Sequence, residues 1–180
     1  MSLGYDRPMR DENLESTGTT LDGTLIALRP IRPDDEPVLQ DLFAHMSLED
    51  VRQRFFAPMR ELSHALASRL SHLDYGGEMA LVAQHNGMTL GVARYSADRD
   101  RLSAEFAVAV RSDWHGRGVG YLLMGRLIEI AQRSGIGELF GLVLHENKPM
   151  LDMCRELGFS FAPEPNDATV LRVRKSLAPV

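Results

Sequence analysis

The stretch Arg-Ser-Asp-Trp-His-Gly-Arg-Gly-Val-Gly occupies residues 111–120 and carries glycine at three alternate positions, 116, 118 and 120. An apolar run, residues 102–110, precedes it, and an amphipathic helical pattern, residues 118–134, follows it. Glycines lack a Cβ and so let backbone amides turn inward, while the start of the next helix offers unpartnered N–H groups and a positive dipole. The stretch therefore predicts a cradle for a phosphate or pyrophosphate between a strand and a helix.

A glycine-rich loop is weak evidence when it stands alone, because an ordinary strand-to-helix turn also favours glycine. The stretch lacks the Gly-Lys-Ser/Thr ending of a P-loop, and it lacks the wider G-x-G-x-x-G spacing of a dinucleotide-binding loop. The sequence thus argues against both of these nucleotide-binding motifs.

Strand and helix patterns alternate along the rest of the chain. Strands are expected at residues 24–29, 79–83, 89–95, 102–110, 139–144, 159–161 and 169–173. Helices are expected at residues 33–46, 63–72, 118–134 and 147–157, and a further helix begins near residue 47. Asn86-Gly87 predicts a tight hairpin turn. The run 102–110 is almost entirely apolar, which is typical of a central strand that is buried on both faces.

Length and composition narrow the class of protein. The chain has 180 residues, of which 44% are apolar, enough for one substantial core. Its net charge of −5 argues against non-specific nucleic-acid binding, and no apolar run reaches the ~18–20 residues of a membrane span. We expect a cytoplasmic protein with a flexible leader at residues 1–20 and one domain at residues 21–180.

Three ordered motifs resemble one known family. Residues 110–120 are similar to the acetyl-CoA pyrophosphate motif Gln/Arg-x-x-Gly-x-Gly/Ala of the GNAT (Gcn5-related N-acetyltransferase) family, with His115 at the first position. Leu144-His-Glu-Asn147 and Glu156-Leu-Gly-Phe159 resemble the next two family motifs. Residues 50–160 are most similar to the acetyltransferase domain of bacterial Pat-type protein lysine acetyltransferases, which usually carry a further regulatory or ligase-like domain.

The resemblance implies a mixed α/β GNAT fold, in which helices flank a central, mostly antiparallel sheet of six to seven strands. It also implies acetyl-CoA as cosubstrate, with no metal. The implied cofactor-binding residues are Val108, Val110, His115, Gly116, Arg117, Gly118, Val119, Gly120 and Asn147.

The resemblance assigns the role of general base to Glu105, acting on the acceptor amine through a water molecule. An ordinary carboxylate is a weak base, so we expect burial of Glu105 among Phe106, Ala107 and their neighbours to make it a stronger one. The family's strand splay, which frees backbone amides for the oxyanion, is assigned by resemblance to residues 108–110. A structural Glu105, bonded to the backbone or to an arginine, is the alternative.

Cys154 stands where many GNAT enzymes have a tyrosine that protonates the departing CoA thiolate. A thiol could act as that acid. However, Met150, Leu151, Cys154 and Leu157 share one helical stripe, which favours a packing role instead. The other histidines show no metal-ligand spacing, so no metal site is expected.

Three functions remain open at this stage. The first is acetylation of a protein lysine, for example on an AMP-forming acyl-CoA ligase, and the second is acetylation of a small amine. The third is a non-catalytic acyl-CoA sensor. Acidic residues around the helices that follow the first strand could attract a lysine-bearing partner: Asp34, Asp35, Glu36, Asp41, Glu49 and Asp50. The oligomeric state is not predicted.

Overall fold

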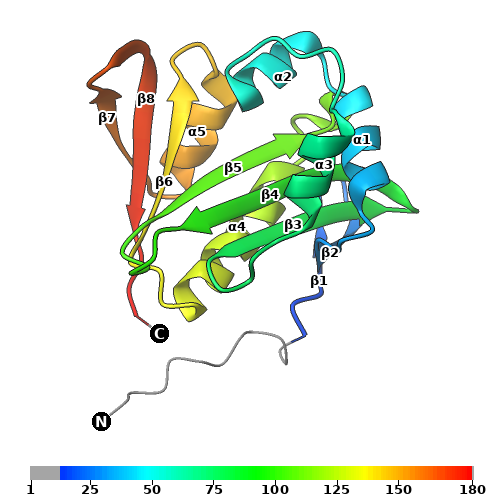
Figure 1. Ribbon diagram of the computed structural model, residues 1–180, viewed down its shortest axis with the longest axis horizontal. Helices are drawn as coiled ribbons and strands as arrows, with labels where there is room; N and C mark the ends of the chain where they lie inside the picture. Colours follow the sequence, from blue (N-terminus) through cyan, green and yellow to red (C-terminus); the bar gives the residue numbers. More distant parts are fainter. Residues whose placement is uncertain (1–12, 180) are drawn as a thin grey trace.

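The computed structural model describes residues 13–179, which form a single eight-stranded sheet with helices on both faces (Figure 1). The strand order is β1-β2-β3-β4-β5-β6-β8-β7, and every neighbouring pair is antiparallel except β5 and β6. The strands are β1 (Ser16–Thr19), β2 (Leu25–Pro30), β3 (Glu78–His85), β4 (Met88–Ala97), β5 (Ala104–Val110), β6 (Glu138–Leu144), β7 (Ser160–Glu164) and β8 (Asp167–Ser176). The helices are α1 (Glu36–Ala44), α2 (Leu48–Phe55), α3 (His64–Ser71), α4 (Val119–Arg133) and α5 (Lys148–Glu156).

The mixed α/β class is confirmed, but the sheet has one strand more than the six to seven expected. The additional strand, β1, lies within residues 1–20, which were expected to be a flexible leader. Its short polar sequence, Ser-Thr-Gly-Thr, has no apolar alternation, so its pairing with β2 left no periodic signal. Residues 1–12 of the expected leader lie outside the described residues.

Local signals account for most of the element boundaries. The side chains of Ser47 and Ser63 accept hydrogen bonds from the backbone N–H groups of the first turns of α2 and α3. Asn86 and Gly87 both have positive φ, 48° and 75°, as the tight hairpin between β3 and β4 requires. The turn confirms the predicted hairpin, and the two caps lie at residues 47 and 63, where these helices were expected to begin.

Two apolar clusters cover the two faces of the sheet. On one face, α1, α2 and α3 pack on β3 and β4 through residues that include Leu42, Phe43 and Val82. On the other, α4 packs through Leu123 and Leu127, among others, and Figure 1 shows it behind the strands. Helix α4 therefore covers one face of the sheet, and α1, α2 and α3 cover the other.

Strands β5 and β6 pair over only two positions, Ala104 with Leu139 and Glu105 with Phe140. Beyond these positions the strands separate, and Figure 1 shows β5 and β6 diverging, with α5 beside β6. The strand β5 nevertheless stays paired with β4 along its whole length, and β6 with β8. The sheet therefore opens like a V at its centre while both arms remain hydrogen-bonded.

The ring of Phe106 occupies the point at which the strands separate. A Cβ added to Gly141 of β6 would lie 2.7 Å from this ring, so only glycine leaves room for it. Phe159 packs against the same ring, with 5.3 Å between the ring centroids. The Phe106 ring thus packs where β5 and β6 separate, in the space that Gly141 leaves for it.

The strand β5 is central in the sheet, as expected, but it is not buried on both faces. Its side chains alternate, with Ala104, Phe106 and Val108 buried and Glu105 exposed. Leu102 lies before the strand and is 68% exposed. The run of small apolar residues concealed this alternation, because alanine and valine occupy buried and half-buried positions alike.

We expect Gly141→Ala to lower the free energy of unfolding by about 1–3 kcal/mol, because the new methyl group would overlap the Phe106 ring. Urea denaturation followed by circular dichroism measures this change. Gly125→Ala is the matched control, since no atom lies within 4 Å of its added Cβ in α4. This control should stabilise the protein by about 0.5–1 kcal/mol, the usual gain of alanine over glycine inside a helix. Equal stability of Gly141→Ala and wild type would contradict the tight packing of the Phe106 ring against Gly141.

Candidate functional site

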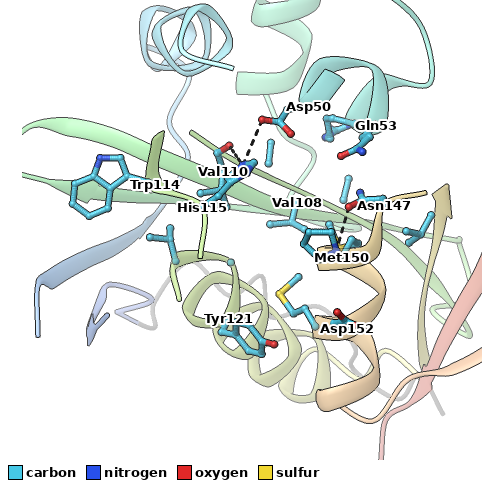
Figure 2. Close-up of a pocket in the computed structure, with 18 of the residues that line it drawn as sticks. Asp50, Gln53, Val108, Val110, Trp114, His115, Tyr121, Asn147, Met150 and Asp152 are labelled. Carbon is cyan, nitrogen blue, oxygen red and sulfur yellow. Dashed lines mark hydrogen bonds and ion pairs between the residues drawn. The ribbon is translucent and has the colours of Figure 1, made fainter. Parts of the chain in front are cut away.

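A cavity of about 1070 Å³ lies where β5 and β6 diverge, and Figure 2 shows its lining. It is lined by one wall of β5, the loop after it, the start of α4, the exposed face of α5 and the side of α2. Of the predicted site residues, those that line it are Glu105, Val108, Val110, His115, Gly116, Gly118, Val119, Gly120 and Asn147. Arg117 and Cys154 are not among the lining residues.

The pairing of β5 with β4 determines which backbone amides face the gap. The Arg111 N–H donates to the Leu90 carbonyl, so Arg111 and every second residue before it point their amides at β4. Phe106, Val108 and Val110 have the opposite parity, and they face β6 where β6 has moved away. The N–H groups of Val108 and Val110 therefore line the gap, where a bound molecule can reach them.

The glycine loop supplies a second set of amides. Gly116 and Gly118 have φ of 73° and 95°, and Gly118 is the N-cap residue of α4, a helix of 15 residues. No atom lies within 4 Å of a Cβ built at Gly116, and Gly116 lines the cavity. This arrangement fits a pyrophosphate, because both the orphan N–H groups and the helix dipole favour negative charge.

His115 connects the glycine loop to α2. Its Nε2 lies 3.1 Å from the Val110 carbonyl oxygen and 3.6 Å from a carboxylate oxygen of Asp50 (Figure 2). The Ser112 hydroxyl donates to Asp50 and accepts from the Ser47 N–H at 2.7 Å. Helix α2 is therefore tied to the loop through the carboxylate of Asp50, whose side chain is 19% exposed.

Arg117 differs from the rest of the predicted set. Its guanidinium lies 3.6 Å from the centre of the Trp114 ring and forms an ion pair of 2.6 Å with Asp22, in the turn between β1 and β2. Its backbone carbonyl accepts from the Leu21 N–H. The positive charge of Arg117 is thus engaged outside the cavity, and its side chain closes the first hairpin onto the glycine loop.

Asn147 lies at the other side of the gap, directly after β6 and its turn. Its side-chain oxygen accepts a hydrogen bond from the Met150 N–H and caps α5 (Figure 2). The amide NH₂ of Asn147 remains available to donate into the cavity.

The profile of the acetyltransferase (GNAT) family matches residues 41–159. The chain belongs to the GNAT family. An acetyltransferase of Pseudomonas aeruginosa is 31% identical over 160 residues, which are 87% of this chain and 86% of that protein. The GNAT domain of S. lividans PAT has a TM-score of 0.86 and 27% identity, covering 91% of this chain and 97% of that domain.

The acetyltransferase Pat of Mycolicibacterium smegmatis is 29% identical over 161 residues. These residues are 88% of this chain and 47% of that protein, so the chain spans about half the length of this relative. The expected family and the expected enzyme class, an acetyltransferase, are both confirmed by these matches.

The structure contradicts the prediction that the side chain of Glu105 is buried. Its side chain is exposed at the cavity wall and is not buried among its neighbours, because it alternates with the buried Ala104 and Phe106. Arg54 of α2 is partly buried and interacts electrostatically with Glu105. The wall of the cavity thus carries a carboxylate and a guanidinium near each other.

Cys154 occupies the position of the GNAT tyrosine but lies inside the core with an exposed fraction of 0%. Burial raises the pKa of this thiol to about 12. The face that α5 turns to the cavity is instead formed by Met150, Met153 and Glu156. The sulfur of Cys154 therefore packs, as the stripe of apolar residues in α5 indicates.

Several lining residues were not predicted. Tyr121 of α4 donates a hydrogen bond of 2.7 Å to Glu156, which raises the pKa of Tyr121 to about 12 and keeps its hydroxyl protonated at neutral pH. Met150, Met153 and Glu156 recur at helical spacing in α5. That periodicity could have identified the cavity face once Asn147 was taken as the start of the helix.

The acidic residues expected to attract a partner are mostly engaged within the chain. Asp35 is buried in an ion pair with Arg29 at 2.7 Å, and Glu49 pairs with Arg52 at 2.8 Å. Glu36 contacts His64, and Asp50 is bonded to Ser112. Within residues 13–179, no group of three or more His, Cys, Asp or Glu side chains could hold a metal ion, and no helix is long and apolar enough to cross a membrane.

We expect Cys154 to be unreactive toward a disulfide reagent such as DTNB in the native protein at pH 8. With a pKa of about 12, only about one thiol in ten thousand would be ionised at that pH, and the thiolate is the reactive form. Absorbance at 412 nm should show one reactive thiol only after the protein is unfolded in guanidinium. Rapid labelling of the folded protein would contradict the packing role and restore Cys154 as a candidate acid.

Proposed function

We propose that this GNAT enzyme transfers the acetyl group of acetyl-CoA directly to an amine in a ternary complex, and that the amine is the lysine side chain of another protein. An AMP-forming acyl-CoA ligase is the acceptor we test. The single observation that supports this reaction is the V-shaped gap between β5 and β6. Along this gap the glycine loop, the free amides of β5 and the carboxylate of Glu105 line one cavity.

The glycine loop and the start of α4 would hold the pyrophosphate, and the amide of Val110 would bind the arm that follows it along β5. Acetyl-CoA supplies a thioester carbonyl, whose oxygen becomes negative as the amine attacks. The N–H of Val108 faces the gap and is already oriented by the pairing of β5 with β4, so it can stabilise that charge without rearrangement. Asn147 would donate from the opposite side of the gap.

The acceptor must lose a proton. A lysine amine has an ordinary pKa near 10.4, so presenting it neutral at pH 7 costs about 4.6 kcal/mol. Glu105 is the carboxylate on β5 that lines the cavity, and its exposure leaves room for a water molecule between it and the amine. Glu105 would accept the proton through this water.

The departing CoA thiol has no cysteine acid within reach, because Cys154 is sealed in the core. A thiolate is a weaker base than an amine, so the CoA thiolate can leave without a dedicated acid. The absence of a tyrosine at position 154 therefore affects only the protonation of the released CoA thiolate. The attack of the amine on the thioester does not depend on it.

Two observations support a protein acceptor. The first is the similarity to the GNAT domain of S. lividans PAT, which extends over 91% of this chain. The second is the openness of the cavity beside α2, where Glu105 is accessible from solvent. Most of the acidic residues around α1 and α2 pair with other side chains of the chain. A partner would therefore be recognised at the cavity itself more than by a general negative surface charge.

The test incubates a purified AMP-forming acyl-CoA ligase with acetyl-CoA and either wild-type protein or Glu105→Gln, and detects acetyl-lysine by mass spectrometry. We expect site-selective modification by the wild type and a rate lower by about 10²–10⁴ in Glu105→Gln, the usual loss on removal of a general base. Acetyl-CoA binding, measured by calorimetry, should be the same in both proteins.

Glu129→Gln is the matched control, because Glu129 is an exposed carboxylate of α4 that does not line the cavity. It should acetylate the ligase as the wild type does. Failure of the wild type to modify the ligase while still binding acetyl-CoA would reject this acceptor and favour a small amine or a non-catalytic acyl-CoA sensor.

A further inference from the structure

Arg54 is an unusual cation for the wall of a cavity. It lies in the last turn of α2, lines the cavity and is partly buried. Its guanidinium lies 4.6 Å from the centre of the Phe55 ring, which covers one of its faces. It makes no hydrogen bond and no ion pair within 4 Å with any residue in the range 13–179, although a guanidinium has five N–H donors.

The charged groups around Arg54 do not neutralise it. Those that interact with it are Arg94 of β4, which is also partly buried, and Glu105 of β5, which forms no direct ion pair with it. Burial and the neighbouring Arg94 lower the pKa of Arg54 to about 10, so it still carries its charge at neutral pH. Arg52, two residues earlier, shows the ordinary arrangement, because it pairs with Glu49 and Glu146 at the surface.

Arg54 lies further than Asp50 from the glycine loop that would hold the phosphates of CoA. Asp50 contacts His115 and Ser112 beside that loop, and Arg54 follows one helical turn later, on the side of Glu105. Glu105, beside Arg54, lies five residues before Val110, the last residue of β5, and a strand rises by ~3.3 Å per residue. Glu105 and Val110 are therefore about 17 Å apart along β5, and the glycine loop begins only after Val110. The parts of the substrates expected at the Glu105 end of β5 are the acceptor and the acyl group, so we assign the anion that Arg54 would bind to one of these.

We propose that Arg54 forms a carboxylate-binding subsite at the acceptor end of the cavity, which takes a carboxylate carried either by the acceptor near its amine or by the acyl group. This inference rests on the proposed acyl transfer and refines its substrate class. A planar guanidinium with free donors matches a carboxylate in a bidentate pair, and a partly desolvated site strengthens that pair. With Glu105 receiving the amine and Arg54 the carboxylate, the wall recognises a substrate that has both groups.

The experiment compares matched ligands by calorimetry. One arm uses succinyl-CoA against butyryl-CoA, which have four-carbon acyl groups with and without a carboxylate. The other arm uses the CoA-saturated protein and a lysine peptide with Glu next to the lysine, against the same peptide with Gln. Each pair is measured with wild type, Arg54→Gln, Arg54→Lys and the control Arg52→Gln.

We expect the carboxylate ligand of one pair to bind the wild type and Arg52→Gln roughly tenfold more tightly than its neutral partner, and Arg54→Gln to lose this preference. Arg54→Lys should retain only part of it, because lysine keeps the charge but not the planar fork. A preference in the peptide arm assigns the carboxylate to the acceptor, and one in the CoA arm assigns it to the acyl group.

Absence of any preference in the wild type, or a preference that survives in Arg54→Gln, would overturn the subsite. Circular dichroism serves as the folding check, and Arg54→Lys replaces Arg54→Gln as the decisive variant if the latter does not fold. These readouts need no turnover. Loss of ligase acetylation with an intact carboxylate preference would therefore reject the proposed acceptor and leave the subsite standing.

Discussion

The separation of β5 from β6 after two paired residues is the constraint on which the rest of the site depends. A sheet normally satisfies the backbone groups of a central strand on both sides, and here one side of β5 is given up. The Phe106 ring fills the vertex, Gly141 makes room for it, and the separate pairings with β4 and β8 keep each arm rigid. The amides that become free are therefore held in place by the sheet, which is what preorganised binding of a developing negative charge requires.

The sequence predicted the parts of the fold that depend on local chemistry. Asn86-Gly87, the serine caps of α2 and α3, and the glycines around residue 118 act over a few residues, so their effects can be read directly. It did not predict β1, whose pairing with β2 comes from tertiary context and leaves no periodic pattern. The divergence of β5 and β6 was supplied only by the family resemblance, because it depends on Phe106 and Gly141, which are 35 positions apart and unremarkable separately.

The sequence likewise predicted the parts of the candidate site that have a local motif and missed those that depend on contacts between distant elements. The glycine loop and Asn147 lie at the cavity, where motif spacing put them. The burial of Glu105 was predicted wrongly, since a run of small apolar residues conceals which face of a strand meets solvent. Arg54 was overlooked because only the packing of α2 against β5 distinguishes it from the surface-paired Arg52. Residues whose roles arise from contacts between distant elements carry no signature in their own neighbourhood.

The pairing of Arg117 with Asp22 has a consequence for how the enzyme would respond to salt. A loop that holds an anion with free lysine or arginine side chains gains much of its affinity from long-range attraction, which mobile ions screen within about 10 Å at 0.1 M. Here both arginines of residues 111–120 are already paired with carboxylates, Arg111 with Asp113 and Arg117 with Asp22 of the first hairpin, and Arg117 is also stacked on Trp114. Retention of the phosphates would then depend on short-range amide contacts and on α4, and it would vary little between dilute and concentrated electrolyte.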